Sequence, residues 1–198
     1  MEELLQVFSY DKSMLNESIE RSFKKTLTNG KHFMIVLIFI VNKGKYLIQK
    51  VSKEKGGCFA VTGGHVSFKD NGFKTCKKET YEEIGLELND NEIKYVDTFD
   101  IKNCFVEIYY INKDVNINEL KLQKSEVGNV YWMNEDEIND LINNETVLEM
   151  KKYYQHGSTS CFEHCYNVAY VCYKMAKKLG LDYVSATRGA MLHDLFLY

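Results

Sequence analysis

Apolar residues along the first part of the chain gather in short runs that are separated by turn residues. The first run, FMIVLIFIV at positions 33–41, is too short to span a bilayer and predicts a strand that is buried on both faces. The runs YLIQKV and CFAVT predict two more strands, and the second leads straight into a double glycine. β-Branched and aromatic residues predict three later strands, at positions 93–99, 104–111 and 127–133. We therefore expect a mixed α/β body that extends to about residue 145.

A helical pattern follows the double glycine. Asp70 or Asn71 is placed to cap a helix that runs from about residue 72 to residue 84, and Gly85 is placed to end it. Four residues recur at three- and four-residue spacing and predict the buried stripe of this helix: Phe73, Cys76, Thr80 and Ile84. Farther along, Asn134 and Glu137 form a capping-box pattern that predicts another helix start.

Composition and charge narrow the class of partner. With 45% hydrophobic and 27% charged residues among 198, the chain has an ordinary globular composition. Its net charge of -3 argues against binding to nucleic acid or to a membrane surface, since either partner favours a basic patch. The six cysteines form no C-x-x-C pair, and the N-terminal stretch is acidic and mixed rather than basic and then apolar. We therefore expect a cytoplasmic protein with reduced thiols and a small-molecule partner.

Three glutamates crowd one arc of the helix predicted at 72–84. Glu82 and Glu83 follow Glu79 by three and four positions, so they share an arc with it beside the buried stripe. Like charges at this spacing weaken a helix by a few tenths of a kcal/mol per pair. Clustered carboxylate oxygens suit Mg²⁺, which would remove that repulsion and still retain waters that a phosphate substrate replaces. The alternative is a solvated acidic face with lysines at its edge.

The segment at 64–86 resembles the signature box of the Nudix hydrolases, G-x5-E-x7-R-E-U-x-E-E-x-G-U, in which U is a bulky aliphatic residue. Here Gly64 is followed after five residues by Asp70, and after seven more by the run KETYEEIGL. The last three glutamates and both glycines of the box fall at the required spacing. The resemblance implies a Nudix-like α/β/α sandwich with a mixed sheet over residues 1–145, followed by a small all-α segment at 146–198.

The resemblance also implies roles for individual residues. Glu79, Glu82 and Glu83 would be catalytic and would hold Mg²⁺, with Mn²⁺ as an alternative ion. Lys78 would orient one of these carboxylates, and Asp70 would brace the loop before the helix. Gly63 and Gly64 would line the substrate loop. The chain departs from the family pattern at three positions of the box. Asp70 replaces a glutamate, Lys78 replaces an arginine and Thr80 replaces an aliphatic residue.

The activity that the resemblance implies is hydrolysis of the diphosphate bond in a nucleoside diphosphate joined to another group. The general base is either a glutamate of the box or Glu126, for which an exposed loop glutamate is the simpler interpretation. His65 either touches substrate or makes a loop hydrogen bond with the backbone. Aromatic residues that could stack on a base, but that are more often core in strands, are Phe59, Tyr109, Tyr110 and Trp132.

Three other functions are compatible with parts of the sequence. The departures at Asp70 and Lys78 favour a non-catalytic, nucleotide-binding or regulatory Nudix module. The stretch before the box also resembles the related isopentenyl diphosphate isomerases, but Gly63 stands where those enzymes place a catalytic cysteine, and Cys58 lies five residues earlier. That departure disfavours an isomerase.

The third alternative comes from residues 146–198. Ser160 and Glu163 predict the start of a long helix that ends at Gly180, and a second helix carries His193 and Asp194. With His164, this pair resembles the start of an HD phosphohydrolase domain, whose remaining helices are missing here. The simpler interpretation is that the helices pack on the first domain or on a second copy of the chain, which would give a homodimer.

Overall fold

The computed structural model describes residues 2–28, 30–142, 154–156, 159–178, 180–183, 186–187 and 190. These residues fall into two compact units. Unit 1 comprises Met1–Ile40 and Thr62–Lys113, and unit 2 comprises Val41–Val61 and Asp114–Tyr198. The domain boundary that we expect after residue 145 lies outside the described residues and stays a prediction.

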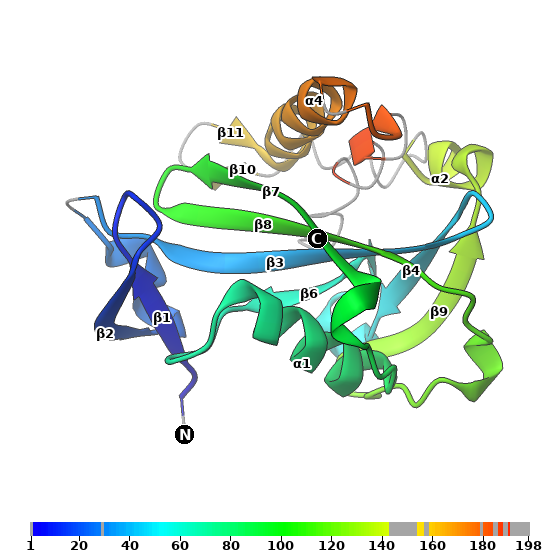
Figure 1. The fold of residues 1–198 in the computed structure, drawn as a ribbon, viewed down its shortest axis with the longest axis horizontal. Helices are drawn as coiled ribbons and strands as arrows, with labels where there is room; N and C mark the ends of the chain where they lie inside the picture. Colours follow the sequence, from blue (N-terminus) through cyan, green and yellow to red (C-terminus); the bar gives the residue numbers. More distant parts are fainter. Residues whose placement is uncertain are drawn as a thin grey trace. The chain divides into compact units, whose positions relative to one another are not determined.

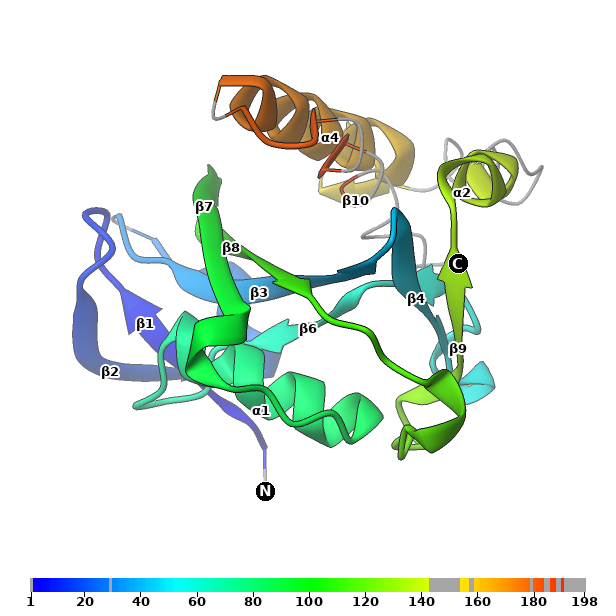
Figure 2. The same ribbon diagram turned by 45° about the vertical axis from the view of Figure 1, so that its right-hand side comes forward.

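Unit 1 is built on strands that pack against one helix. In chain order its elements are β1 (Leu4–Phe8), β2 (Met14–Glu20), η1 (Arg21–Thr26), β3 (Phe33–Asn42, whose last two residues belong to unit 2), β6 (Thr62–His65), α1 (Gly72–Ile84), η3 (Asp90–Glu92), β7 (Ile93–Ile101) and β8 (Cys104–Asn112). Strand β3 is bonded to β6 and β8, and β7 is bonded to β8. Helix α1 lies along one face of this sheet in both views (Figures 1 and 2). The predicted strands at 33–41, 93–99 and 104–111 are confirmed within two residues at each end.

The double glycine lies inside strand β6 rather than after a strand. Gly63 pairs with Leu37 and Gly64 with Val36 in an antiparallel register. A Cβ on Gly63 would collide with the carbonyl oxygen of Val36, so a side chain cannot be accommodated here. The single strand expected at 58–62 is instead two: β5 (Phe59–Ala60) and β6. The prediction of one strand was wrong because the apolar run continues across the interruption at Val61.

An N-terminal hairpin, which the apolar pattern did not predict, supports the loop before α1. Strands β1 and β2 are antiparallel, and Leu5 also pairs with Ser67 of that loop. Gln6 is 1% exposed. Its side-chain amide donates to the carbonyl oxygens of Val7 and Leu15, and its side-chain oxygen accepts from the backbone N–H of Lys69 at 2.9 Å. This one buried side chain therefore joins both strands of the hairpin to the loop.

Helix α1 has the bounds that the sequence predicts. Asn71 caps it by accepting a hydrogen bond from the backbone N–H of Lys74, and Gly85 ends it in the left-handed region at φ 69°. The residues that it buries are Gly72, Thr75, Cys76, Thr80 and Ile84. Phe73, which we placed on the buried stripe, is only half-buried. The buried face is therefore rotated toward Gly72 and Thr75, and the close approach of Gly72 to the sheet explains the rotation.

A carboxylate lies between α1 and the sheet. Glu107 of β8 accepts a hydrogen bond from the hydroxyl of Tyr109 at 2.7 Å. A Cβ on Gly72 would lie 2.7 Å from the carboxyl carbon of Glu107 and closer still to one of its oxygens. Burial raises the pKa of Glu107, and it raises the pKa of the neighbouring Cys76 thiol to about 12. The lack of a side chain at Gly72 therefore makes room for the carboxyl group of Glu107 against the first turn of the helix.

Unit 2 contains the remaining described elements: β4 (Lys45–Val51), η2 (Lys53–Lys55), β5, η4 (Ile117–Glu119), β9 (Val127–Met133), α2 (Glu135–Ile142), β10 (Tyr154–His156), β11 (Thr159–Ser160) and α4 (Cys161–Lys178). Strand β4 pairs with both β5 and β9 in antiparallel registers. The capping box that opens α2 is confirmed, since Asn134 and Glu137 exchange backbone-to-side-chain hydrogen bonds of 2.7 and 2.9 Å. The predicted strand at 127–133 is confirmed as β9.

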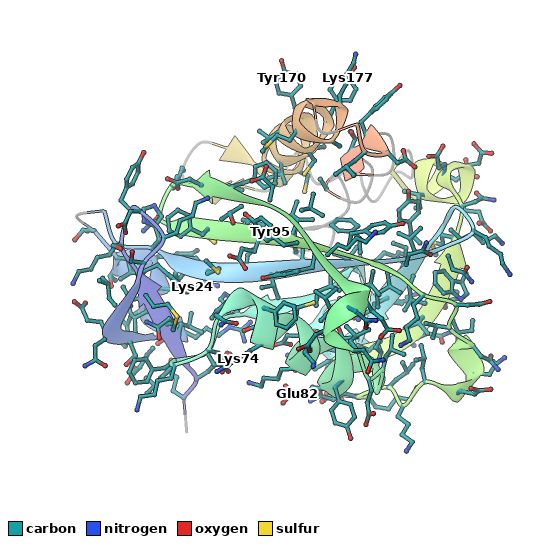
Figure 3. All side chains as sticks on the ribbon, in the orientation of Figure 1. Lys24, Lys74, Glu82, Tyr95, Tyr170 and Lys177 are labelled. Carbon is teal, nitrogen blue, oxygen red and sulfur yellow. The ribbon has the colours of Figure 1, made fainter. Side chains whose placement is uncertain are left out.

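The segment expected to be entirely helical also contains a short hairpin. Strands β10 and β11 pair directly before α4, which is the long helix that the sequence predicts. The chain leaves that helix through Gly180 at φ 67°. Tyr170 and Lys177 project from α4 (Figure 3). His193 and Asp194 lie outside the described residues. None of the helices in the described part of the chain has the length and apolar character needed to cross a membrane.

Candidate active site

The three glutamates of the box lie on α1 and differ in exposure. Glu79 and Glu83 are half-buried, whereas Glu82 is exposed on the outer side of the helix (Figure 3). The charge of Glu82 acts on Glu79, which agrees with the predicted shared arc. The helix thus presents two partly buried carboxylates, Glu79 and Glu83, and one that faces solvent, Glu82.

Glu79 is held against the backbone of β6. A Cβ on Gly64 would lie 2.5 and 2.7 Å from the two carboxylate oxygens of Glu79, so only glycine leaves this carboxylate in place. Burial, followed by the charge of Glu82, raises the pKa of Glu79 to about 7. In the described part of the chain no donor is bonded to its oxygens, so the cost of burying the carboxylate is not offset by a hydrogen bond.

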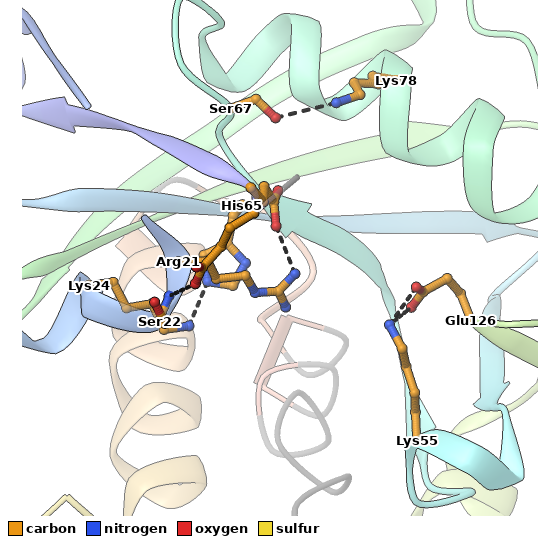
Figure 4. A network of polar contacts seen from close by, with 10 residues as sticks. Arg21, Ser22, Lys24, Lys55, His65, Ser67, Lys78 and Glu126 are labelled. Atoms are coloured by element: carbon orange, nitrogen blue, oxygen red, sulfur yellow. Dashed lines mark hydrogen bonds and ion pairs between the residues drawn. The ribbon is translucent and has the colours of Figure 1, made fainter. Parts of the chain in front are cut away.

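Lys78 and Asp70 occupy the loop-facing side of α1 and its entry. The ammonium of Lys78 is 3.3 Å from the hydroxyl of Ser67, and its charge acts to lower the pKa of Glu79 (Figure 4). Asp70 is half-buried, and its backbone N–H donates to the carbonyl oxygen of Ser67 at 2.9 Å. The roles of Lys78 and Asp70 stay predictions. The loop contact that the sequence did not reveal is that of Gln6 with Lys69.

His65 lies in β6 rather than in a loop, and it meets a cation from the N-terminal part of the chain. Its Nε2 is 2.7 Å from Nζ of Lys24 on η1 (Figure 4). Burial, then the charges of Lys24 and Arg21, lowers the pKa of His65 to about 3. His65 is therefore neutral at pH 7, and its unprotonated nitrogen accepts a hydrogen bond from Lys24. Arg21 and Lys24 were absent from the sequence prediction because 41 positions separate Lys24 from His65.

The remaining candidates have structural partners. Glu126 lies in unit 2, where its carboxylate is paired with the ammonium of Lys55 (Figure 4). Trp132 donates its indole N–H to the carbonyl oxygen of Val115 at 3.0 Å. Tyr109 is buried and bonded to Glu107, so the core interpretation of this aromatic residue is confirmed.

The donor set around Glu79 fits a hard divalent cation. Among the described residues, no three His, Cys, Asp or Glu side chains converge as a ready-made metal site. Mg²⁺, however, requires only one or two carboxylates, and water and substrate phosphate complete its coordination. Glu79 and Glu83 supply such oxygens from one rigid helix. The enclosed Glu79 carboxylate, to which no donor among the described residues is bonded, is suited to be neutralised by a cation.

Comparison with known proteins places the chain among relatives of the Nudix hydrolases. No family model matches the sequence. The uncharacterized Nudix hydrolases lmo0368 of Listeria monocytogenes and lin0387 of Listeria innocua are each 26% identical over 138 residues, which cover 65% of this chain and 82% of theirs. The crystal structure of DR0079 from Deinococcus radiodurans superposes with a TM-score of 0.57 at 17% identity, over 71% of this chain and 88% of DR0079.

The chain thus has a Nudix-like α/β fold with a mixed sheet, and it is a distant relative of proteins named as Nudix hydrolases. The predicted fold class is confirmed. None of these comparisons supports the HD resemblance of residues 146–198.

Proposed function

We propose that the chain is a Mg²⁺-dependent Nudix pyrophosphohydrolase that cleaves the diphosphate bond of a nucleoside diphosphate linked to another group. The observation that carries the proposal is the placement of Glu79, whose carboxylate is enclosed against Gly64 and has no bonded donor among the described residues. A structural carboxylate at this depth would be expected to have a hydrogen-bond donor. A carboxylate that binds a metal ion is instead neutralised by that ion, so it does not need a hydrogen-bond donor from the protein.

The residues of the candidate site would have separate roles in binding the metal ion and activating the substrate. Glu79 and Glu83 would hold the divalent ion, with Glu82 at the solvent side of the same helix. A bound Mg²⁺ or Mn²⁺ would neutralise diphosphate oxygens and polarise phosphorus for attack by water. Lys78 would act on the charge of Glu79, as its position on α1 already allows. The proton acceptor for the attacking water would be a glutamate of the box; Glu126, the other candidate, belongs to unit 2, and its role stays a prediction.

The test is Mg²⁺-dependent hydrolysis of a panel of nucleoside diphosphate derivatives by the full chain and by two matched variants. Glu83→Gln removes a proposed metal ligand, and Glu87→Gln removes the same charge from an exposed position beyond the end of α1. We expect turnover in the parent and in Glu87→Gln, with a loss of at least roughly 100-fold in Glu83→Gln, because metal activation contributes several kcal/mol. Equal rates in the two variants would exclude the metal role of Glu83.

A non-catalytic nucleotide-binding module is the second candidate. Among the described residues Lys78 contacts Ser67 rather than a carboxylate, which favours this module because the lysine then does not fix the orientation of a box glutamate. The same panel separates the two functions. Nucleotide binding without product formation in either Mg²⁺ or Mn²⁺ would favour the module over the enzyme.

A further inference from the structure

Lys24 is a half-buried cation that has no carboxylate partner among the described residues. Its ammonium donates to Nε2 of His65 at 2.7 Å and lies over the ring of Phe33, 5.3 Å from the ring centroid. The ion pairs of the described residues do not include Lys24. Burial, followed by the charge of Arg21, lowers the pKa of Lys24. A desolvated ammonium that is held by a neutral imidazole and an aromatic face still lacks a counter-ion.

Arg21 adds a second positive charge to the same place. It lies three residues before Lys24 on η1, and its charge is felt by both Lys24 and His65. Its one ion pair among the described residues is with Glu3, at 2.8 Å, and the side chains of both partners are more than a third exposed. An exposed pair of this kind is weak, so the guanidinium remains available for a stronger anion. Figure 4 shows Arg21, Lys24 and His65 side by side.

This cationic group borders the glutamates of the box. His65 directly follows Gly64, whose missing side chain leaves the space in which the Glu79 carboxylate lies. The charge of Arg21 also acts on Glu79. Basic groups of η1 and an acidic group of α1 thus both lie at the Gly64–His65 end of β6. Among the described residues, neither Arg21 nor Lys24 forms an ion pair with Glu79, which is the arrangement expected when a third charged group binds between them.

We propose that Arg21 and Lys24, with His65 as a neutral positioning residue, form an anion subsite that binds a phosphate group of the substrate. The proposal rests on the proposed function, because it assigns the substrate's second phosphate to η1 while the first faces the metal-binding glutamates. An ammonium and a guanidinium are the two side-chain groups best suited to phosphate oxygens. His65 holds the ammonium in place without adding a charge of its own.

The probe is inorganic pyrophosphate, titrated calorimetrically into the full chain in EDTA, so that binding does not depend on a metal. Lys24→Met and Arg21→Met each remove a charge and keep an apolar stem of similar length. Lys25→Met removes the same charge from the exposed next position of η1 and serves as the matched control. We expect the dissociation constant to rise by about tenfold or more in the first two variants, as the loss of a charge-assisted hydrogen bond implies, and to change by less than about twofold in the control.

Several results would overturn the subsite: absence of metal-free pyrophosphate binding in the parent, or equal affinities in Lys24→Met and Lys25→Met. Lys24→Gln also removes the charge and should raise the dissociation constant by about tenfold or more, which preserves the test if the methionine variant does not fold. Glu83→Gln separates this subsite from the proposed function, since it should abolish turnover and leave pyrophosphate binding intact. If Lys24→Met turns over substrate with an unchanged KM, the subsite is refuted and the proposed enzymatic activity is not. If the chain binds pyrophosphate but turns over no substrate of the panel, the proposed enzymatic activity is refuted and the anion subsite is not.

Discussion

Glu79 and Glu107 are two half-buried carboxylates of unit 1, and each lies against a glycine that leaves room for it. Glu79 faces Gly64, and Glu107 faces Gly72. Burial raises the pKa of both. They differ in their partners: Glu107 accepts a hydrogen bond from Tyr109, whereas the described residues offer Glu79 no bonded donor.

Among the described residues, Glu107 therefore has a hydrogen-bond donor and Glu79 does not. Burial alone does not distinguish a structural acid from a functional one, because desolvation raises both pKa values. The presence or absence of a bonded donor does. By this criterion Glu107 is a structural acid at the contact between α1 and the sheet, and Glu79 is the carboxylate that we propose binds a ligand.

The largest expected effect comes from neutralising each carboxylate in turn. Glu79→Gln should lower kcat/KM by roughly 1000-fold, which is about 4 kcal/mol of transition-state stabilisation, because it removes a proposed metal ligand. Glu107→Gln should change kcat/KM by less than about threefold, since it leaves that ligand set untouched. Steady-state kinetics on one substrate compare the two. Similar losses in both variants would show that the two carboxylates do not differ in role.

The next effect is on stability and comes from Gly72→Ala. The new methyl group would occupy the position of the Glu107 carboxylate and approach the Tyr109 hydroxyl to 2.8 Å, so we expect a loss of about 3 kcal/mol in the free energy of unfolding. Urea unfolding followed by circular dichroism measures it. In a Glu107→Ala background the same substitution should cost much less, because the clash is gone. Equal costs in the two backgrounds would mean that the carboxylate is not what Gly72 accommodates.

A smaller loss of stability should follow from Tyr109→Phe. It leaves the Glu107 carboxylate buried without its donor, at a cost of about 1–2 kcal/mol. Tyr95→Phe is the matched control, since the Tyr95 hydroxyl bonds to Thr98 at 2.7 Å but the side chain is 53% exposed. We expect the control to cost less than about 0.5 kcal/mol. A cost for Tyr109→Phe no larger than that of the control would remove the basis for calling Glu107 satisfied.

The two carboxylates can also be compared through the pH dependence of metal-free stability. The folded pKa of Glu79, about 7, lies above its ordinary value of 4.5, so the native state binds more protons than the unfolded state between these values. The free energy of unfolding should therefore fall as pH rises from about 4.5 to 7, and Glu79→Gln should reduce that slope. Thermal unfolding in EDTA across this range measures it. An unchanged slope in the variant would contradict the raised pKa.

Helix α1 could be predicted from the sequence because its signals are local. Asn71 caps it, Gly85 ends it, and the apolar spacing lies within thirteen residues. The contribution of η1 could not be predicted. Lys24 meets His65 through a tertiary contact across 41 positions, and the β1–β2 hairpin that brings it there is mostly polar on its second strand.

The role of Glu107 was not predicted, although the sequence pattern contains a signal for it. Glu107 interrupts an apolar strand and is in phase with Phe105 and Tyr109, which places it on the buried face of a period-two pattern. A charge in such a position predicts either a buried partner or a ligand. The sequence could not say which, because the answer depends on Gly72 and on the side-chain hydroxyl of Tyr109.

The loop between β6 and α1 is tied to the N-terminal hairpin through backbone hydrogen bonds. The N–H of Phe68 donates to Leu4, the N–H of Lys69 donates to the side chain of Gln6, and the N–H of Gln6 donates to Val66. Loops usually exchange their amide hydrogens for deuterium early, because local opening requires little free energy. Here the amides at 68 and 69 are released only when β1 detaches, so loop and hairpin should exchange together, as one cooperative segment.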